Sequence, residues 1–214
     1  MQTYTINEIF YSVQGEGKRA GTPNVFVRFS GCNMQCSMQE GKLSPGGFDC
    51  DTEFVSGRRL TAQQIVEEAR TLSPACNWII LTGGEPGLQV DAALCDFLHN
   101  AGYSLAIETN GSVELPKRVD AAQSVADYLI DWITVSPKVA EHAVRQCFAH
   151  EVKYVRGHGQ GVPRPVCEAL HYLISPAFYG ATLDTRALEW CTQMVLQNPK
   201  WELTVQQHKL WKVR

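Results

Sequence analysis

Short apolar runs recur along the chain, and longer amphipathic segments separate them. The runs are rich in Val, Ile, Phe and Trp, which is typical of strands buried on both faces. Their alternation with helical segments predicts βαβ units and therefore a parallel sheet in an α/β fold. The expected strands cover residues 25–29, 78–82, 105–108, 132–135, 152–155, 172–174 and 202–205.

Helix signals occupy the intervals between these runs. Thr61 and Gln64 have the spacing of a capping box, and apolar residues then recur on one helical face. Gly102 follows another amphipathic segment and suits a left-handed helix cap. The expected helices cover residues 61–72, 91–101, 140–150, 163–171 and 184–197.

The composition is that of an ordinary globular protein. The chain has 214 residues, of which 44% are hydrophobic and 19% charged, so one domain with a normal core is expected. The net charge of -3 argues against an extended basic surface for nucleic acid. Residues 1–5 have no secretory pattern, and no apolar run approaches a bilayer span. We therefore expect a cytoplasmic protein with reduced thiols.

Three of the eight cysteines, Cys32, Cys36 and Cys50, share a glycine-rich loop after the first expected strand. Four thiolates saturate a cubane iron–sulfur cluster, whereas three leave one iron free to bind another molecule. Structural zinc is the main alternative, but it needs four ligands, and no histidine lies between Tyr4 and Trp78. Unliganded buried cysteines are the third interpretation. The remaining cysteines are scattered singly and are interpreted as small buried apolar residues, at Cys76, Cys95, Cys147, Cys167 and Cys191.

Unusual motifs follow four successive expected strands. Cys32 follows the first, Gly-Gly-Glu-Pro at 83–86 the second, Glu-Thr-Asn-Gly at 108–111 the third, and Ser-Pro-Lys at 136–138 the fourth. Ligands of parallel α/β folds bind at the carboxyl ends of strands, so these motifs are expected on one rim. Paired glycines allow close backbone approach to a ligand. The alternative for each motif alone is an ordinary turn.

Polar residues in the first and last segments suggest further ligand contacts. The Gln-Gly-Glu-Gly segment at 14–17 offers a carboxamide and a carboxylate to a heterocycle, unless it is a solvent turn. Arg28 interrupts an apolar strand and needs a partner, either an anionic substrate group or a buried carboxylate. The tail at 206–214 follows the last strand, so its terminal carboxylate either reaches the rim or frays.

Together these motifs resemble the radical S-adenosylmethionine superfamily and, within it, the 7-carboxy-7-deazaguanine synthase family. The resemblance covers nearly the whole chain. The cysteines and the Gly-Gly-Glu-Pro motif indicate the superfamily. The family is indicated by the motifs at 14–17, 50–52 and 134–138.

The resemblance implies a contracted, partial TIM-like barrel of β6/α3 type with mainly parallel strands. It implies a homodimer of single radical SAM domains spanning 1–214, with a cluster-binding loop insertion at 37–49. A [4Fe-4S] cluster would be held by Cys32, Cys36 and Cys50, and its open iron would chelate S-adenosylmethionine. An electron donor such as flavodoxin would reduce the cluster and release a 5'-deoxyadenosyl radical. That radical would take hydrogen from C6 of 6-carboxy-5,6,7,8-tetrahydropterin, whose ring contracts and expels ammonia while S-adenosylmethionine is regenerated.

The family's site residues map onto specific positions of this chain. A Mg²⁺ ion would join the substrate carboxylate to Thr52, a suitable oxygen donor. The terminal carboxylate of Arg214 would meet the guanidine edge of the pterin. The substrate-binding set is Val13, Gln14, Gly15, Arg28, Thr82 and Arg214. The cosubstrate-binding set is Asp49, Cys50, Asp51, Gly84, Glu108, Ser136, Pro137 and Lys138.

The cysteine spacing departs from the superfamily pattern. Thirteen residues separate Cys36 from Cys50, where two are usual, and Gly47 stands where a second cysteine would lie. A longer loop costs little closure entropy, so the ligand set is still expected to be Cys32, Cys36 and Cys50. The rival functions are a glycyl-radical-enzyme activase, a non-catalytic iron–sulfur electron carrier and a structural zinc protein. Thr52 and Arg28 argue against the activase, because a protein substrate requires neither residue.

Overall fold

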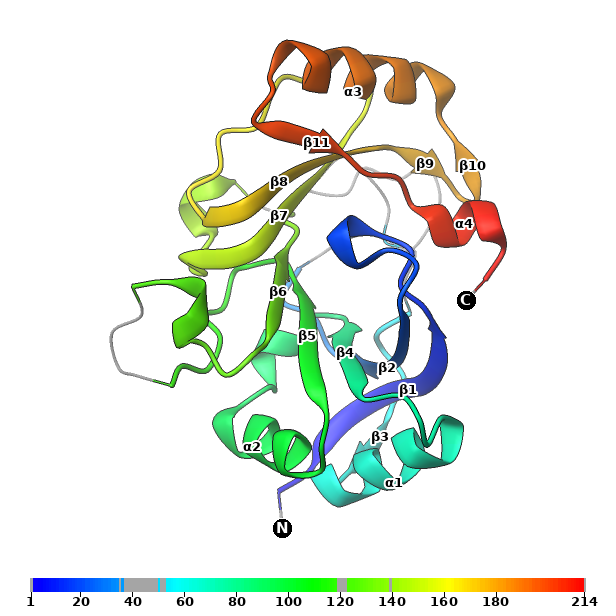
Figure 1. Cartoon of the computed structure of the whole chain (residues 1–214), viewed down its shortest axis with the longest axis vertical. Coiled ribbons are helices and arrows are strands. Elements are labelled where there is room, and N and C mark those ends of the chain that lie inside the picture. Colours follow the sequence, from blue (N-terminus) through cyan, green and yellow to red (C-terminus); the bar gives the residue numbers. More distant parts are fainter. Residues whose placement is uncertain are drawn as a thin grey trace.

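A long, mainly parallel sheet organises the chain (Figure 1). A computed structural model describes residues 2–34, 36, 50, 53–118, 123–138 and 140–213. Within these residues the main sheet has nine strands in the order β11-β8-β7-β6-β5-β4-β2-β1-β3. The strands that pair in parallel are β2 (Pro23–Phe29), β4 (Trp78–Gly83), β5 (Ser104–Thr109), β6 (Trp132–Val135), β7 (Phe148–Arg156), β8 (Glu168–Pro176) and β11 (Trp201–Leu203).

These parallel strands confirm the sequence prediction of an α/β fold. Each expected apolar run lies in one of them, except that the run at 202–205 extends beyond the end of β11 at Leu203. Two further strands at the sheet edge were not predicted. β1 (Tyr4–Val13) pairs antiparallel with β2, and β3 (Arg58–Leu60) pairs antiparallel with β1. A separate two-stranded ribbon joins β9 (Phe178–Tyr179) to β10 (Thr182–Leu183).

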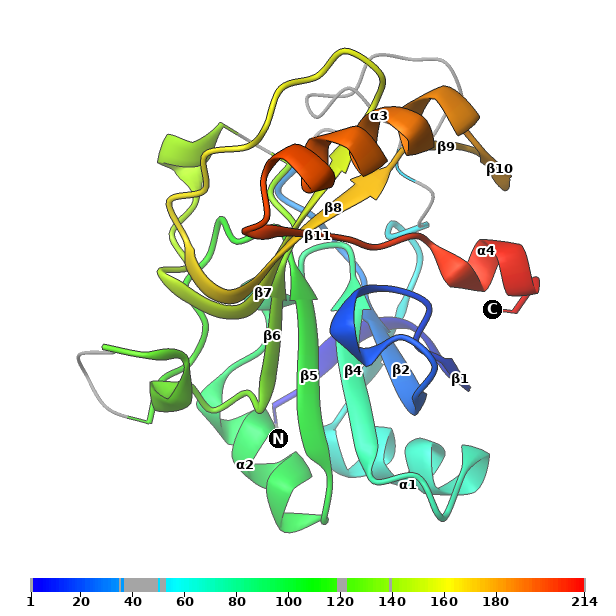
Figure 2. The same ribbon diagram turned by 45° about the horizontal axis from the view of Figure 1, so that its top comes forward.

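Three of the expected helices form as predicted. They are α1 (Ala62–Leu72), α2 (Ala92–Asn100) and α3 (Thr185–Gln197). The Thr61–Gln64 capping box is present, and Gly102 has a φ of 91° after α2. A short helix, α4 (Gln207–Trp211), follows β11 near the C-terminal end of the described chain (Figure 2).

The helices expected at 140–150 and 163–171 are wrong. The first segment holds only a 3-10 turn at Glu141–Ala143, and β7 starts at Phe148. The backbone amides of Arg145 and Gln146 both donate to Gly111 O, at 2.7 and 3.0 Å, which draws this segment into an extended form. In the second segment β8 begins at Glu168 and pairs with β7. Tertiary pairing therefore overrides the local helical pattern.

The two faces of the sheet have different partners. One face packs against α1, α2 and α3 and holds the main core, as in Val27, Ile79 and Ile107. Alternate residues point to the opposite, concave face, where a smaller apolar cluster forms a floor. That floor consists of Phe10, Phe26, Ile80 and Ala106, with Trp78 and Trp132 packed against it.

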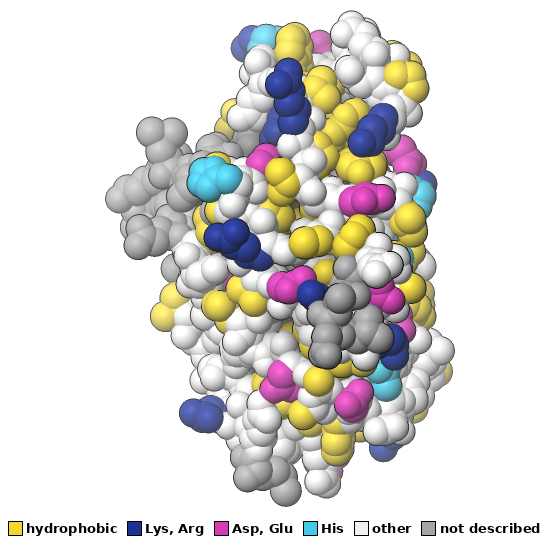
Figure 3. All heavy atoms as spheres, turned by 90° about the vertical axis from the view of Figure 1, so that its left-hand side faces the viewer, with side chains coloured by type: hydrophobic (Ala, Val, Ile, Leu, Met, Phe, Trp, Pro, Cys, Tyr) yellow, Lys and Arg dark blue, Asp and Glu magenta, His cyan; other side chains and the backbone are white. Residues whose placement is uncertain are grey.

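The arrangement agrees with the expected partial barrel. Helices α1, α2 and α3 each join consecutive parallel strands, and the remaining crossovers within the described chain are loops with short 3-10 turns. None of the described helices is long and apolar enough to cross a bilayer. On the face shown in Figure 3, positive and negative side chains are interspersed.

Candidate active site

The site is built one layer above the apolar floor of the concave face. Strand alternation places Arg28, Thr82 and Glu108 two residues beyond the floor residues of β2, β4 and β5. Arg28 pairs in register with Thr82, and Glu108 with Thr134 of β6. These polar residues line two cavities that share Glu16, Thr82, Glu108 and Gln206.

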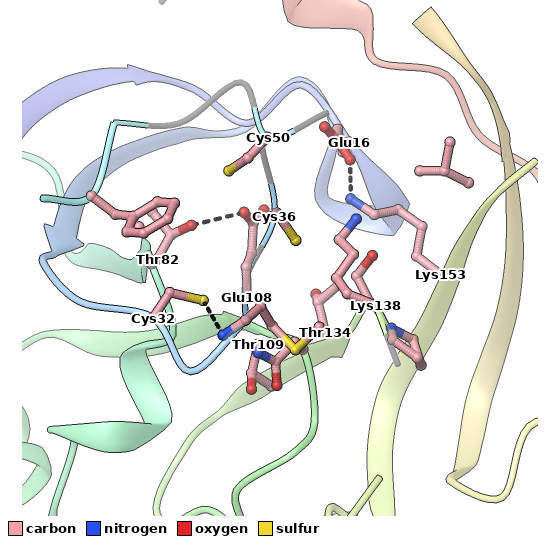
Figure 4. Close-up of a pocket in the computed structure, with 18 of the residues that line it drawn as sticks. Glu16, Cys32, Cys36, Cys50, Thr82, Glu108, Thr109, Thr134, Lys138 and Lys153 are labelled. Carbon is pink, nitrogen blue, oxygen red and sulfur yellow. Dashed lines mark hydrogen bonds and ion pairs between the residues drawn. The ribbon is translucent and has the colours of Figure 1, made fainter. Parts of the chain in front are cut away.

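The first cavity has a volume of about 240 Å³ and is lined by Cys32, Cys36 and Cys50. The three cysteines are in the thiol form and half-buried. Burial is the main cause that raises the pKa of the Cys32 and Cys36 thiols, and the Cys50 thiol adds to both. Figure 4 shows the cysteines on one side of this cavity and Lys153 on the other.

The paired glycines of the 83–86 motif hold the start of the cysteine loop. Gly84 N donates to Phe29 O and Glu85 N to Gly31 O, both at 2.9 Å. A Cβ at Gly84 would overlap the carbonyl oxygen of Gly31, and Gly83 has a φ of 112°. Only glycine permits this close backbone approach. The motif therefore supports the loop that carries Cys32, and Gly84 also lines the first cavity.

Glu85 is fully buried and ties this turn to the end of β5. Its carboxylate accepts hydrogen bonds from Thr109 Oγ1 at 2.6 Å and Asn110 N at 2.7 Å. Burial raises the pKa of Glu85. Asn110 Nδ2 in turn donates to Asn33 Oδ1 at 3.1 Å, next to Cys32. Glu85 thus acts as a structural carboxylate behind the cysteine loop.

The second cavity, of about 450 Å³, adjoins the first and is lined by Val13, Gln14, Gly15 and Arg28. Glycine is required at two positions of the 14–17 motif, because a larger side chain there would overlap neighbouring residues. A Cβ at Gly15 would overlap His208, and one at Gly17, whose φ is 67°, would overlap the Glu151 carboxylate. The motif is therefore a packed turn and not a solvent turn.

Glu108 joins the two cavities. Its Oε1 accepts a hydrogen bond from Gln14 Nε2 at 2.8 Å, and its Oε2 accepts one from Thr82 Oγ1 at 3.1 Å. The residue expected to bind cosubstrate is thus bonded to two residues expected to bind substrate.

Glu16 and Lys153 form a buried ion pair at the same boundary (Figure 4). Lys153 is 7% exposed, and burial lowers its pKa to about 8. The other carboxylate oxygen of Glu16 accepts from Gln206 Nε2 at 2.7 Å.

Arg28 has a partner within the protein. Its NH1 lies 3.2 Å from Glu8 Oε1, and its guanidinium lies 5.1 Å from the centre of the Phe10 ring. From the sequence, either a buried carboxylate or an anionic substrate group was expected as its partner. The structure supplies the carboxylate, and Arg28 still lines the second cavity.

Most of the expected site residues lie in these cavities. The first cavity is lined by the expected cosubstrate residues Cys50, Gly84, Glu108, Ser136, Pro137 and Lys138. The second is lined by the expected substrate residues Val13, Gln14, Gly15, Arg28 and Thr82. Four predictions, together with the 37–49 insertion, lie outside the described residues, namely Asp49, Asp51, Thr52 and Arg214.

Sequence reasoning missed several lining residues. Lys153 interrupts an apolar strand as Arg28 does, so the same signal was present. Thr134, Arg156 and His208 also line the cavities and gave no such signal. The interpretation of the single cysteines as buried is wrong for Cys147, which is exposed.

The first cavity offers thiols for a metal centre, while its two carboxylates, Glu16 and Glu108, are bonded to other side chains. Its described lining residues include three cysteines and no histidine. Across the described part of the chain, no group of three or more His, Cys, Asp or Glu residues is arranged to hold a metal ion directly. The chemistry of the donors fits a cluster that takes three thiolates and leaves one iron open.

A mainly parallel partial barrel with three thiols on one rim cavity has the architecture of radical S-adenosylmethionine enzymes. No family model matches the chain. The 7-carboxy-7-deazaguanine synthase of Bacteroides thetaiotaomicron is 40% identical over 212 residues, which cover 98% of each chain. The synthase of Burkholderia multivorans is 35% identical, with 97% of each chain covered.

A solved structure has the same fold. The crystal structure of QueE from Escherichia coli matches with a TM-score of 0.65 at 23% identity, covering 96% of this chain and 95% of that one. The chain belongs to the 7-carboxy-7-deazaguanine synthase family.

Proposed function

We infer that this protein is a radical S-adenosylmethionine lyase that makes 7-carboxy-7-deazaguanine from 6-carboxy-5,6,7,8-tetrahydropterin, with loss of ammonia, in the queuosine pathway. One observation carries this inference beyond family membership. The cavity with three thiols opens onto a second polar cavity, and Glu108 and Thr82 line both. A cosubstrate bound beside the thiols therefore adjoins a small molecule in the second cavity.

The family implies a [4Fe-4S] cluster and S-adenosylmethionine, and the residues of the first cavity fit both. Cys32, Cys36 and Cys50 would hold the cluster. When bound, the cluster and its cosubstrate supply a reversible one-electron hydrogen abstraction. The protein's part is to hold the reactants close together and to keep water away from the reacting carbon.

The remaining residues of the first cavity supply the polar contacts proposed for the cosubstrate. The Glu108 carboxylate can accept hydrogen bonds from ribose hydroxyls, because each of its oxygens has more than one lone pair. The Ser-Pro-Lys motif at 136–138 follows β6 beside it, and Ser136 N donates to Thr109 O at 2.8 Å. The Lys138 ammonium suits a carboxylate group. Gly84 leaves room for close approach, and Asp49 and Asp51 complete the proposed set.

The pterin is proposed to bind in the second cavity. The carboxamide of Gln14 and the hydroxyl of Thr82 offer donors and acceptors to its ring, and Val13 and Gly15 form a wall. Arg28 offers a positive charge to the substrate carboxylate, balanced by Glu8. A Mg²⁺ ion at Thr52 and the terminal carboxylate of Arg214 are further proposals.

We also propose that the whole chain acts as one radical SAM domain, with the 37–49 segment as its insertion. The proposed assembly is a homodimer, the proposed reductant is a flavodoxin-like donor, and the proposed location is the cytoplasm. The continuous main sheet from β3 to β11 supports the single domain.

The decisive experiment is an anaerobic assay with the reconstituted protein, carboxytetrahydropterin, S-adenosylmethionine, Mg²⁺ and a reductant. We expect 7-carboxy-7-deazaguanine and ammonia as products. An intact cluster that cleaves S-adenosylmethionine and forms no deazaguanine would contradict the substrate assignment. An intact cluster whose electron paramagnetic resonance spectrum does not change when S-adenosylmethionine is added would indicate a non-catalytic electron carrier.

A further inference from the structure

Lys153 brings a buried ammonium group to the boundary between the two cavities. It lies on β7 and is 7% exposed, and its side chain points toward Glu16 (Figure 4). A buried ammonium is costly unless an opposite charge compensates it. The Glu16 carboxylate provides that charge, and its side chain is 15% exposed.

Glu16 itself is held from several directions. Lys153 bonds Oε2, and Gln206 Nε2 donates to Oε1 at 2.7 Å. His208 Nδ1 lies 4.0 Å from Oε1, and the Glu16 amide donates to Gln14 Oε1 at 3.1 Å. The carboxylate therefore has a fixed direction while it faces both cavities.

A carboxylate at this boundary has unused acceptor capacity. It offers about four lone-pair sites, of which Lys153 and Gln206 take two. A tetrahydropterin also presents N–H donors on its reduced ring, away from the guanidine edge, and a carboxylate accepts such a donor in a charge-assisted hydrogen bond. The side chain can serve this role only while its orientation is kept.

We propose that Lys153 is a positioning residue for substrate binding, which holds Glu16 so that its carboxylate accepts a hydrogen bond from a ring N–H of the pterin, apart from the guanidine edge proposed for the terminal carboxylate. The proposal rests on the proposed function. It assigns Lys153 no contact with the reacting carbon. Loss of the ammonium should therefore weaken substrate binding much more than it slows turnover at saturation.

The test compares Lys153→Met, Lys153→Arg, Glu16→Gln and the double variant Glu16→Gln/Lys153→Met. The control is Lys117→Met, which breaks an ion pair with Glu114 outside both cavities. For each protein we would measure the Kd of carboxytetrahydropterin by anaerobic equilibrium dialysis, the melting temperature, and KM and kcat. The double variant removes both charges, so it should fold even if an unpaired Glu16 destabilises Lys153→Met.

We expect Lys153→Met to raise Kd and KM about 30-fold or more, with kcat changed only a few-fold. Lys153→Arg should recover most of this loss, and the double variant should bind as weakly as Glu16→Gln alone. If folded Lys153→Met binds the pterin as tightly as the wild type, or if the two substitutions have additive effects in the double variant, the role of Lys153 is overturned. The proposed function still stands in that case, provided that the wild type converts the pterin. Failure of the wild type to bind or convert the pterin would overturn both.

Discussion

Gln14 and Glu108, which lie 94 positions apart in the sequence, are joined by a hydrogen bond of 2.8 Å between Gln14 Nε2 and Glu108 Oε1. This bond crosses the boundary between the cysteine cavity and the second cavity. A ligand that bonds to Glu108 therefore changes the environment of Gln14, and the reverse also holds. Binding of cosubstrate and binding of substrate should be energetically coupled.

The first prediction concerns this coupling. Glu108→Gln keeps the shape of the side chain and loses its charge and one acceptor. We expect it to weaken binding of both the pterin and S-adenosylmethionine by about 1–3 kcal/mol each. Gln14→Leu should weaken mainly the pterin. Calorimetric titration of each ligand, alone and with the other present, measures both effects. Unchanged pterin affinity in Glu108→Gln would contradict the coupling.

The second prediction concerns Gly84. A Cβ there would overlap the Gly31 carbonyl oxygen, so Gly84→Ala must shift the backbone that leads to Cys32. We expect a loss of about 1–3 kcal/mol in the free energy of unfolding and lower iron content after reconstitution. Gly161→Ala is the control, because a Cβ at Gly161 meets nothing within 4 Å. Urea denaturation and iron analysis distinguish the two. Equal stability of both variants would show that the contact is unimportant.

The third prediction concerns the cluster ligands. Cys36→Ala should abolish retention of a [4Fe-4S] cluster, because two thiolates cannot hold the cubane as three do. Cys147→Ala changes an exposed thiol and should keep full iron content. Iron and sulfide analysis with electron paramagnetic resonance provides the measurement. If Cys36→Ala kept its iron, the ligand set would be wrong.

The fourth prediction concerns pH. Burial lowers the pKa of Lys153 to about 8, so the ammonium loses its proton as pH rises through that value. The Kd of the pterin should therefore rise between pH 7 and pH 9. Lys153→Arg should show no such step, because a guanidinium stays protonated in this range.

Comparing the pH dependence of the wild type with that of Lys153→Arg isolates the titration of Lys153. The other charged groups around this cavity are the same in both, and they include Glu16, Glu108, Lys138 and Arg156. Glu151 and His208, which contact the same turn, are also unchanged. A step of equal size in both proteins would assign the titration to another group.

Local patterns predicted much of the fold. Apolar runs predicted the parallel strands because a strand covered on both faces needs apolar residues throughout. Capping residues such as Thr61 predicted where helices begin, because the capping hydrogen bonds join residues only three positions apart. The patterns failed at 140–150, where the bonds from Arg145 and Gln146 to Gly111 decide the conformation. They also missed β1 and β3, which depend on pairing at the sheet edge.

The sequence by itself determined which chemistry the rim carries. Parallel strands bring their carboxyl ends together, so Cys32, Gly84, Glu108 and Lys138 were expected on one rim from their positions after strands. Only the tertiary structure decided how the polar groups pair. Glu16 meets Lys153 across 137 positions, because the strand alternation of β7 turns the lysine inward and the glycine turn at 14–17 brings the carboxylate to it. A local pattern has no information on such a contact, since it depends on the closure of the whole sheet.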